Sequence, residues 1–210
     1  AAPRALALGF LWAGGGRTPH RLTQPSLLEA LRAVDGTHPG FRRNHAKGVC
    51  VTGWFEGNGN AAGLSMASVL QSGRVPVVGR FALAGGMPFQ ADAPAKVRSM
   101  ALRLMPPGGQ EWRMGINDIP VFPVRTPQEF QDLQLASRPD PANGKPDPAR
   151  LQAFRAVHPW LQVAGAPITH RPLSSVFADY TYLSLASFLL VGTDRPATAF
   201  PRSLVPLPTC

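Results

Sequence analysis

The stretch FRRNHAKGVCVTGWFE, residues 41–56, predicts the first strand of the sheet on which the rest of the chain builds. Val49, Val51 and Phe55 favour a pleated, half-buried surface, so a β-strand is expected soon after the histidine. At the mouth of that strand, His45 would be held by a rigid element while its ring still faces a cavity. Considered alone, the stretch is more simply interpreted as a core or rim histidine with solvated arginines before it.

Three more strands are expected downstream. Residues 75–84 and 111–116 carry apolar or β-branched side chains, and residues 97–104 alternate polar with apolar ones. The sequence PPGG at residues 106–109 makes a tight connection between the strands expected at residues 97–104 and 111–116. Four strands joined in this order suit half of an antiparallel barrel.

Helical patterns flank these strands. Before the first strand, Ser26 and Glu29 match a capping box, and Gly36 is a stop signal. After the fourth strand, one helix is expected from Pro127.

The last third of the chain mixes helical and strand patterns. A polar, proline-rich link covers residues 139–148, and a helix is expected over residues 151–157. Residues 177–191 read as a long apolar strand and residues 197–205 as a shorter one.

Length and composition indicate one globular unit. The chain has 210 residues, 44% of them hydrophobic, and its mean hydropathy is -0.03. This is enough to bury a core. The expected organisation is an apolar N-terminal segment, residues 1–24, followed by a single domain, residues 25–210.

The charge is strongly basic. A formal net charge of +9 could indicate nucleic acid or a membrane surface as partner. The arginines are scattered, however, and only Arg42, Arg43 and Lys47 form a local cluster. Because no nucleic-acid motif accompanies them, no nucleic-acid partner is expected.

The N-terminal segment is apolar and glycine-rich between residues 5 and 16. It is too short for a membrane span, which takes roughly 20 residues. It is compatible with the remainder of a signal sequence or membrane anchor, and equally with a loose terminus. Export, for example to the periplasm, is one expectation, and a cytoplasmic location stays open.

The two cysteines lack metal-site spacing. Cys50 lies inside the first predicted strand and is expected to be a small buried hydrophobe. A disulfide with Cys210 is the alternative.

Two later motifs change the interpretation of the opening stretch. VVGRFALAGG at residues 77–86 is followed by the pair Ala91-Asp92, and MGINDIPVFPVR covers residues 114–125. In this order and spacing, the three stretches resemble the haem-dependent catalase family. Its motifs are R-x-x-H-A-K-G, G-R-F-S with an A-D pair, and N-x-x-P-x-F followed by an arginine.

The resemblance runs from about Leu27 to about Val191, and the nearest branch is the compact catalase-related peroxidases. It implies an α+β fold, namely an antiparallel β-barrel of the haem-catalase type, incomplete here, with flanking helices.

The same resemblance implies the chemistry. The cofactor would be haem b, and the substrate hydrogen peroxide, with an organic reductant as a second donor. His45 matches the family's distal acid/base and Asn117 its peroxide-orienting amide. The family forms a ferryl-oxo haem that oxidises a second peroxide or the organic donor.

Four further positions match residues that hold the cofactor. Arg42 and Arg80 fall on the positions that anchor the haem propionates. Phe122 would line the distal pocket, and Phe130 would pack near the haem face. For both phenylalanines, plain core packing is the alternative.

The chain also departs from the family pattern. Ala82 replaces the serine of G-R-F-S, so a hydroxyl that hydrogen-bonds the distal histidine is absent. An acidic position of the access channel falls on Lys96. The first change predicts a less firmly oriented histidine and a shift from dismutation towards peroxidation.

The haem iron of catalases is bound by a tyrosine in an R-x-x-x-Y motif. Tyr180 and Tyr182 are the two tyrosines of this chain, and neither follows an arginine at that spacing. The metal ligand is therefore unknown, and the resemblance implies a C-terminally truncated member. The main alternative to an enzyme is a non-catalytic module that binds haem or no ligand.

Overall fold

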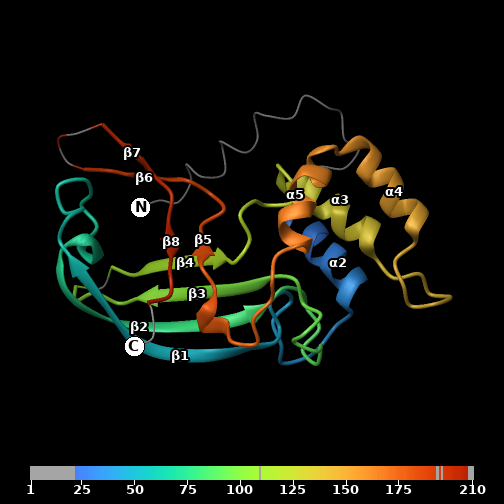
Figure 1. Cartoon of the computed structure of the whole chain (residues 1–210), viewed down its shortest axis with the longest axis horizontal. Coiled ribbons are helices and arrows are strands. Elements are labelled where there is room, and N and C mark those ends of the chain that lie inside the picture. Colours follow the sequence, from blue (N-terminus) through green and yellow to red (C-terminus); the bar gives the residue numbers. More distant parts are fainter. Residues whose placement is uncertain (1–21, 109, 193, 195, 208–210) are drawn as a thin grey trace.

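The computed structural model describes residues 22–108, 110–192, 194 and 196–207. Within them the largest element is a six-stranded antiparallel sheet in the order β1-β2-β3-β4-β5-β8 (Figure 1). Its strands are β1 Gly48–Asn58, β2 Ser72–Leu83, β3 Arg98–Leu104, β4 Trp112–Asn117, β5 Tyr182–Leu183 and β8 Ser203–Leu204. A second sheet pairs β6 Phe188–Leu190 with β7 Thr198–Phe200.

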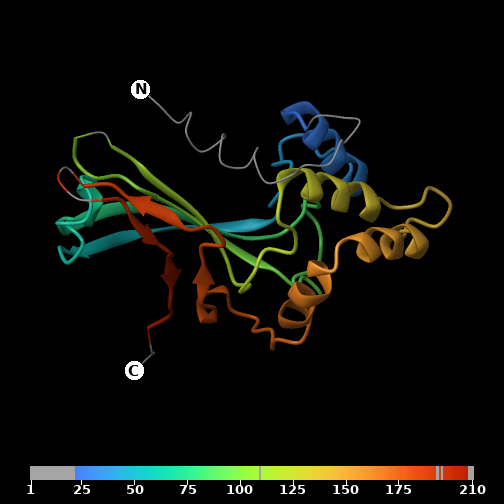
Figure 2. The same ribbon diagram turned by 90° about the horizontal axis from the view of Figure 1, so that it is seen from above.

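The predicted four-stranded meander is confirmed. Strands β1 to β4 pair in chain order, each antiparallel to the one before it. β2 begins at Ser72, earlier than the predicted residue 75, because its pairing with β1 continues to Asn58 at the turn. The sheet curls into a half-barrel, as expected from its twist (Figure 2).

The helices gather beside one end of the sheet in both views (Figures 1 and 2). They are α2 Gln24–Asp35, α3 Pro127–Ser137, α4 Pro148–Val157 and α5 Trp160–Thr169. α2 packs against α3, and the Ser26 hydroxyl donates to the Gln131 side chain at 3.1 Å. The expected helices at 127 and 151 are confirmed.

Two details of the first helix differ from expectation. Its N-cap is Thr23, whose hydroxyl accepts the Ser26 N–H at 3.2 Å. The predicted capping box at Ser26 and Glu29 is therefore placed one turn too late. Pro25 lies in the first turn, where a missing N–H costs nothing.

The predicted long strand over residues 177–191 is wrong. The segment holds a 3₁₀ turn at Phe177–Asp179 and the two short strands β5 and β6. Residues 197–205 likewise form two strands, β7 and β8, separated at Pro201, which has no N–H to pair. α5 was not predicted, because Pro167 and Gly165 inside it are breaker signals.

Buried residues form two clusters. Val75 of β2 and Leu104 of β3 pack with Val69 on one face of the sheet. Val124, Ala136 and Phe154 pack among α3, α4 and the segment before α3. The sheet and the helices thus each have an apolar centre.

Cys50 is exposed and free, so the prediction of a buried hydrophobe is wrong. It points to the face of β1 opposite to Val51 and Phe55, which are partly buried. Cys210 lies outside the described residues, as do residues 1–21 of the N-terminal segment. Among the described helices, none is long and apolar enough to cross a membrane.

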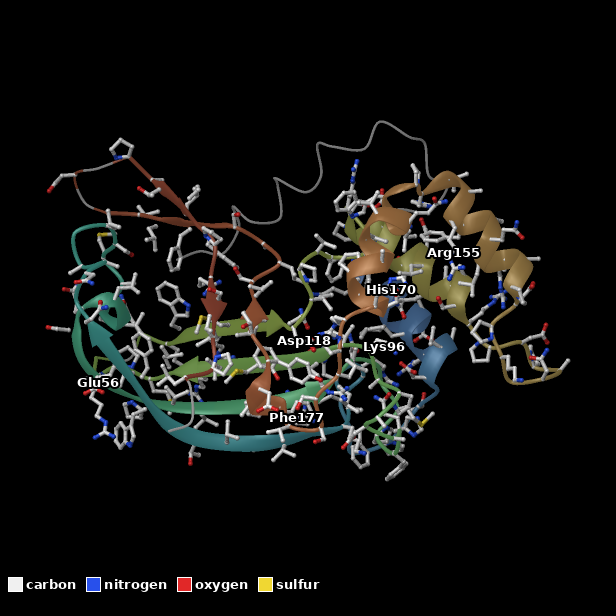
Figure 3. The ribbon with its side chains drawn as sticks, in the orientation of Figure 1. Glu56, Lys96, Asp118, Arg155, His170 and Phe177 are labelled. Carbon is white, nitrogen blue, oxygen red and sulfur yellow. The ribbon has the colours of Figure 1, made fainter. Side chains whose placement is uncertain are left out.

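Antiparallel order brings the predicted site residues to one end of the sheet. β1 and β3 begin there, and β2 and β4 end there. Figure 3 shows Asp118 and Lys96 at this end, beside the helices, and Glu56 at the opposite end. We call this the helix-side end.

Candidate functional site

His45 lies just before β1 in a left-handed backbone conformation, with φ of 55°, alone among the described non-glycine residues. Such a conformation costs of order 1–3 kcal/mol. Asn44 holds it in place, because its side-chain oxygen accepts the N–H of His45 and the N–H of Gly85, each at 2.9 Å. This clamp ties the loop to the end of β2.

The ring of His45 is oriented by a backbone carbonyl. Nδ1 lies 3.2 Å from the Leu83 carbonyl oxygen, which can only accept, so Nδ1 carries the proton and Nε2 presents its lone pair. Burial lowers the pKa of His45 below its usual value of 6.5, against the raising effect of that carbonyl. The charges of Arg80 and Arg42 lower this pKa further. The imidazole is therefore neutral at pH 7.

Arg80 supports the same loop from β2. Its guanidinium donates to the carbonyls of His45 at 2.8 Å and Ala46 at 2.9 Å. Gly48 makes this reach possible, because a Cβ there would lie 2.7 Å from the Arg80 Cζ and 2.2 Å from the Phe81 carbonyl oxygen. The other donors of Arg80 make no hydrogen bond within the described residues.

Arg42 is exposed. Its side chain makes no hydrogen bond or ion pair with the part of the chain that the structure describes. Burial lowers the pKa of Arg80, and the charge of Arg42 lowers it further, as it does for His45. Among the described residues, Arg42 is a cation without a partner beside the histidine.

Asn117 ends β4, opposite Ser99 of β3. The Ser99 hydroxyl donates to the Asn117 side-chain oxygen at 2.6 Å. Within the part of the chain that the structure describes, both donors of the Asn117 amide group have no acceptor. His45 precedes β1 and meets the end of β2, so β2 and β3 lie between the backbone of His45 and that of Asn117.

Asp118 follows Asn117 directly and its side chain is fully buried. Its carboxylate accepts the Arg98 N–H at 2.8 Å and an Arg171 amino group at 2.7 Å. Arg171 also contacts the carbonyl of Lys96, the position that was compared with an access-channel acid. These contacts fix the end of β4 between β3 and the segment after α5.

The A-D pair of the second motif contacts the first motif. The Asp92 carboxylate pairs with Lys47 at 2.8 Å, and Lys47 also donates to the Gln90 carbonyl at 2.7 Å. The Asp92 carbonyl accepts from Arg98 at 2.9 Å. The three motif stretches are thus joined through side-chain contacts at the helix-side end.

Phe122 and Phe130 lie next to each other, with ring centroids 5.7 Å apart. Phe130 packs against the helical cluster, whereas Phe122 is 40% exposed. Phe130 therefore contributes to the core of the helical part. For the exposed Phe122, the cofactor role and the packing role both remain possible interpretations.

The two tyrosines are engaged elsewhere. Tyr180 donates its hydroxyl to the Ser174 carbonyl at 2.9 Å and Tyr182 to the Phe177 carbonyl at 2.8 Å. Burial raises the pKa of Tyr182 far above its usual value, which disfavours the phenolate that a metal requires. No cluster of three or more His, Cys, Asp or Glu suited to a metal exists among the described residues.

Sequence patterns missed three members of this site, namely Asn44, Ser99 and the Leu83 carbonyl. A side-chain acceptor directly before a histidine was the one available signal for Asn44. Ser99 and Leu83 act through cross-strand register, which no local pattern reveals.

The fold and the site define the class to which the chain belongs, an incomplete antiparallel barrel of the catalase type. The match to a crystal structure of a fungal catalase covers 91% of this chain and 39% of the fungal chain, with a TM-score of 0.68 and 20% sequence identity. This likeness shows the fold.

Sequence comparisons show the family. The model of the family described as Catalase matches residues 12–161. A catalase-related peroxidase of Synechococcus elongatus is 34% identical over 185 residues, which is 88% of this chain and 55% of that protein. Another from Mycolicibacterium paratuberculosis is 32% identical, over 88% of this chain and 58% of its own. The chain therefore belongs to the catalase family.

The chain spans about half the length of these curated relatives. The residues matched by the family model include strands β1 to β4 and helices α2 to α4.

Proposed function

We propose that the chain carries the distal, proton-handling side of a haem-dependent enzyme that degrades hydrogen peroxide. One observation carries the proposal, the state of His45. Its Nδ1 is fixed on the Leu83 carbonyl, its pKa is lowered, and Nε2 is left as a base in a clamped loop. A rim histidine without a function would not need a costly backbone conformation.

Haem b fits the residues on the histidine side of the site. Arg42, an exposed cation without a partner among the described residues, suits a propionate, and Arg80 has donors left after binding two carbonyls. When bound, haem would supply the redox chemistry. Neither tyrosine hydroxyl is free to serve as the axial ligand, because both are hydrogen-bonded to carbonyls.

His45 would move the proton that peroxide cleavage requires. Nε2 would accept a proton from one oxygen of hydrogen peroxide and return it to the other, so that the O–O bond breaks and the second oxygen leaves as water. The haem, when bound, would supply the two electrons and take up the first oxygen. The Leu83 carbonyl favours this transfer, since it stabilises the ring while it is protonated. Burial keeps the resting ring neutral.

Asn117 would orient the peroxide. Its amide donors are available because the Ser99 hydroxyl binds the amide oxygen. A donor at a fixed position favours one orientation of a small substrate, and positioning is worth several kcal/mol in such reactions. The absence of a hydroxyl at Ala82 is compensated in part, since the Leu83 carbonyl holds His45 instead.

The test is a haem titration followed by oxygen release on addition of hydrogen peroxide. The proposal predicts a saturable Soret shift, weakened by Arg42→Ala and unchanged by Arg74→Ala, which lies at the opposite end of β2. It predicts that Asn117→Ala slows oxygen release while Asn143→Ala, on an exposed turn, does not. Haem binding that ignores Arg42 would contradict the assignment of the anchor.

A second candidate is a haem-binding module without catalytic activity. The engaged tyrosines favour it, because they leave the iron without the tyrosine ligand that catalases use. A Soret shift without oxygen release would support this candidate. Release of oxygen by the loaded chain would exclude it.

A further inference from the structure

Ser99 lies inside the sheet, beside the amide that the proposed function uses. It is 7% exposed, and its hydroxyl donates to the Asn117 side-chain oxygen at 2.6 Å. A hydrogen bond this short, from a buried donor to a half-buried acceptor, fixes the acceptor well. The partners also sit directly opposite each other in the β3–β4 register.

The cross-strand register shows how Ser99 lies relative to Ala82, the position of the missing hydroxyl. Gly48 pairs with Ala82, Ala82 with Ser99, and Ser99 with Asn117. Because cross-strand partners share a face, these four side-chain positions point the same way. The hydroxyl that is missing at Ala82 is thus present one strand further on, next to Asn117 rather than next to His45.

We infer that Ser99 is a positioning residue that sets the orientation of the Asn117 amide for peroxide. This inference rests on the proposed function and adds a residue to it. An asparagine side chain can rotate by half a turn and exchange its oxygen for its nitrogen. A donor at the oxygen disfavours the exchanged orientation, since the Ser99 hydroxyl proton would then face an N–H group.

The backbone next to the amide is also fixed. The Asp118 N–H donates to the Arg98 carbonyl at 3.0 Å, and the Asp118 carboxylate accepts the Arg98 N–H at 2.8 Å. The main chain on one side of Asn117 is therefore held by β3. What remains to be set is the side-chain torsion, and Ser99 is the described residue that hydrogen-bonds that side chain.

The variants Ser99→Thr and Ser99→Val form a matched pair. Both are β-branched residues suited to a strand, and they differ in a hydroxyl against a methyl group. Thr keeps the donor and Val removes it, so a packing effect alone would appear equally in both. Ser99→Ala serves as the variant of smaller volume.

The first readout needs no haem. Nuclear magnetic resonance of the 210-residue chain, labelled with ¹³C and ¹⁵N, records the side-chain amide of Asn117, which is assigned by its loss in Asn117→Ala. A hydrogen bond to the amide oxygen polarises the group and deshields its carbon and nitrogen. We expect the wild type and Ser99→Thr to share these shifts, and Ser99→Val and Ser99→Ala to lose them. Equal shifts in the Thr and Val variants would overturn the inference.

The second readout is the rate of peroxide consumption by the haem-loaded chain. Ser99→Val is expected to lower it about tenfold, as removal of a residue that orients a site group commonly does, whereas Ser99→Thr should retain it. An amide that reorients in Ser99→Val without any change in this rate would overturn the functional part. If His45→Ala consumed peroxide like the wild type, the proposed function would fail while the amide shifts still decided the role of Ser99.

Discussion

The left-handed backbone of His45 depends on one side-chain oxygen. In Asn44→Ala, the N–H groups of His45 and Gly85 both lose their acceptor. We therefore expect the unfolding free energy to fall by about 1–3 kcal/mol, measured by urea denaturation with tryptophan fluorescence. Asn44→Asp keeps an acceptor oxygen and should retain most of the stability. Equal losses in the two variants would show that the clamp does not exist.

His45 also gives the fold a pH dependence. Because burial lowers its pKa below the unfolded value of 6.5, the unfolded chain binds the proton more readily than the folded one. The stability contributed by neutral His45 is complete above that unfolded pKa, and it is lost as the pH falls through the lower, folded pKa.

The variant His45→Asn tests this dependence. Asparagine tolerates a left-handed backbone and does not titrate in this range. The difference in unfolding free energy between wild type and variant should be constant from about pH 7 to 8 and should shrink or reverse towards about pH 4.5. A difference that is independent of pH would mean that the histidine titrates alike in both states.

At the scale of the elements, the pairing of β1 with β2 needs a glycine at one position. A Cβ at Gly48 would lie 2.2 Å from the Phe81 carbonyl oxygen, a backbone atom that cannot move aside cheaply. Gly48→Ala is expected to cost about 1–3 kcal/mol of unfolding free energy in urea denaturation. Gly53→Ala, on the same strand with no atom within 4 Å, should be neutral or slightly stabilising. A neutral Gly48→Ala would contradict the register of β1.

Which elements could be predicted follows from how local their signals are. Strands β1 to β4 have alternation and turn residues within a few positions, and the motif residues lie at their ends. α5 contains Pro167 and Gly165, which have low helix propensity, so the local sequence does not predict this helix. The run 177–191 is apolar without being one strand, because short pieces of it bury against different partners.

For the candidate site, the sequence predicts the motif residues but not the contacts that support them. His45, Asn117 and the two arginines follow from motif order. Their supporting contacts do not, since Ser99, Asn44 and the Leu83 carbonyl act across strands or through a backbone angle. Cys50 was misjudged because alternation along β1 does not say which face is covered.

At the scale of the whole molecule, one buried ion pair joins the sheet to the helical side. The Asp118 side chain is fully buried and that of Arg171 is 15% exposed, with 2.7 Å between them. Removing one partner leaves a buried charge without compensation, so Arg171→Met is expected to cost about 3–5 kcal/mol in urea denaturation. Arg155→Met, exposed on α4 (Figure 3), should change stability little. Similar small losses of unfolding free energy in both variants would mean that other contacts hold the sheet to the helical side.

The central claim is that His45 is the proton acceptor for hydrogen peroxide, and one measurement tests it most directly. Initial rates of peroxide consumption are compared for haem-loaded wild type, His45→Ala and His170→Ala, the last an exposed histidine at the end of α5 (Figure 3). The account predicts a loss of at least about 100-fold in His45→Ala, with haem still bound, and no loss in His170→Ala. A wild-type rate in His45→Ala with equal haem content would contradict it.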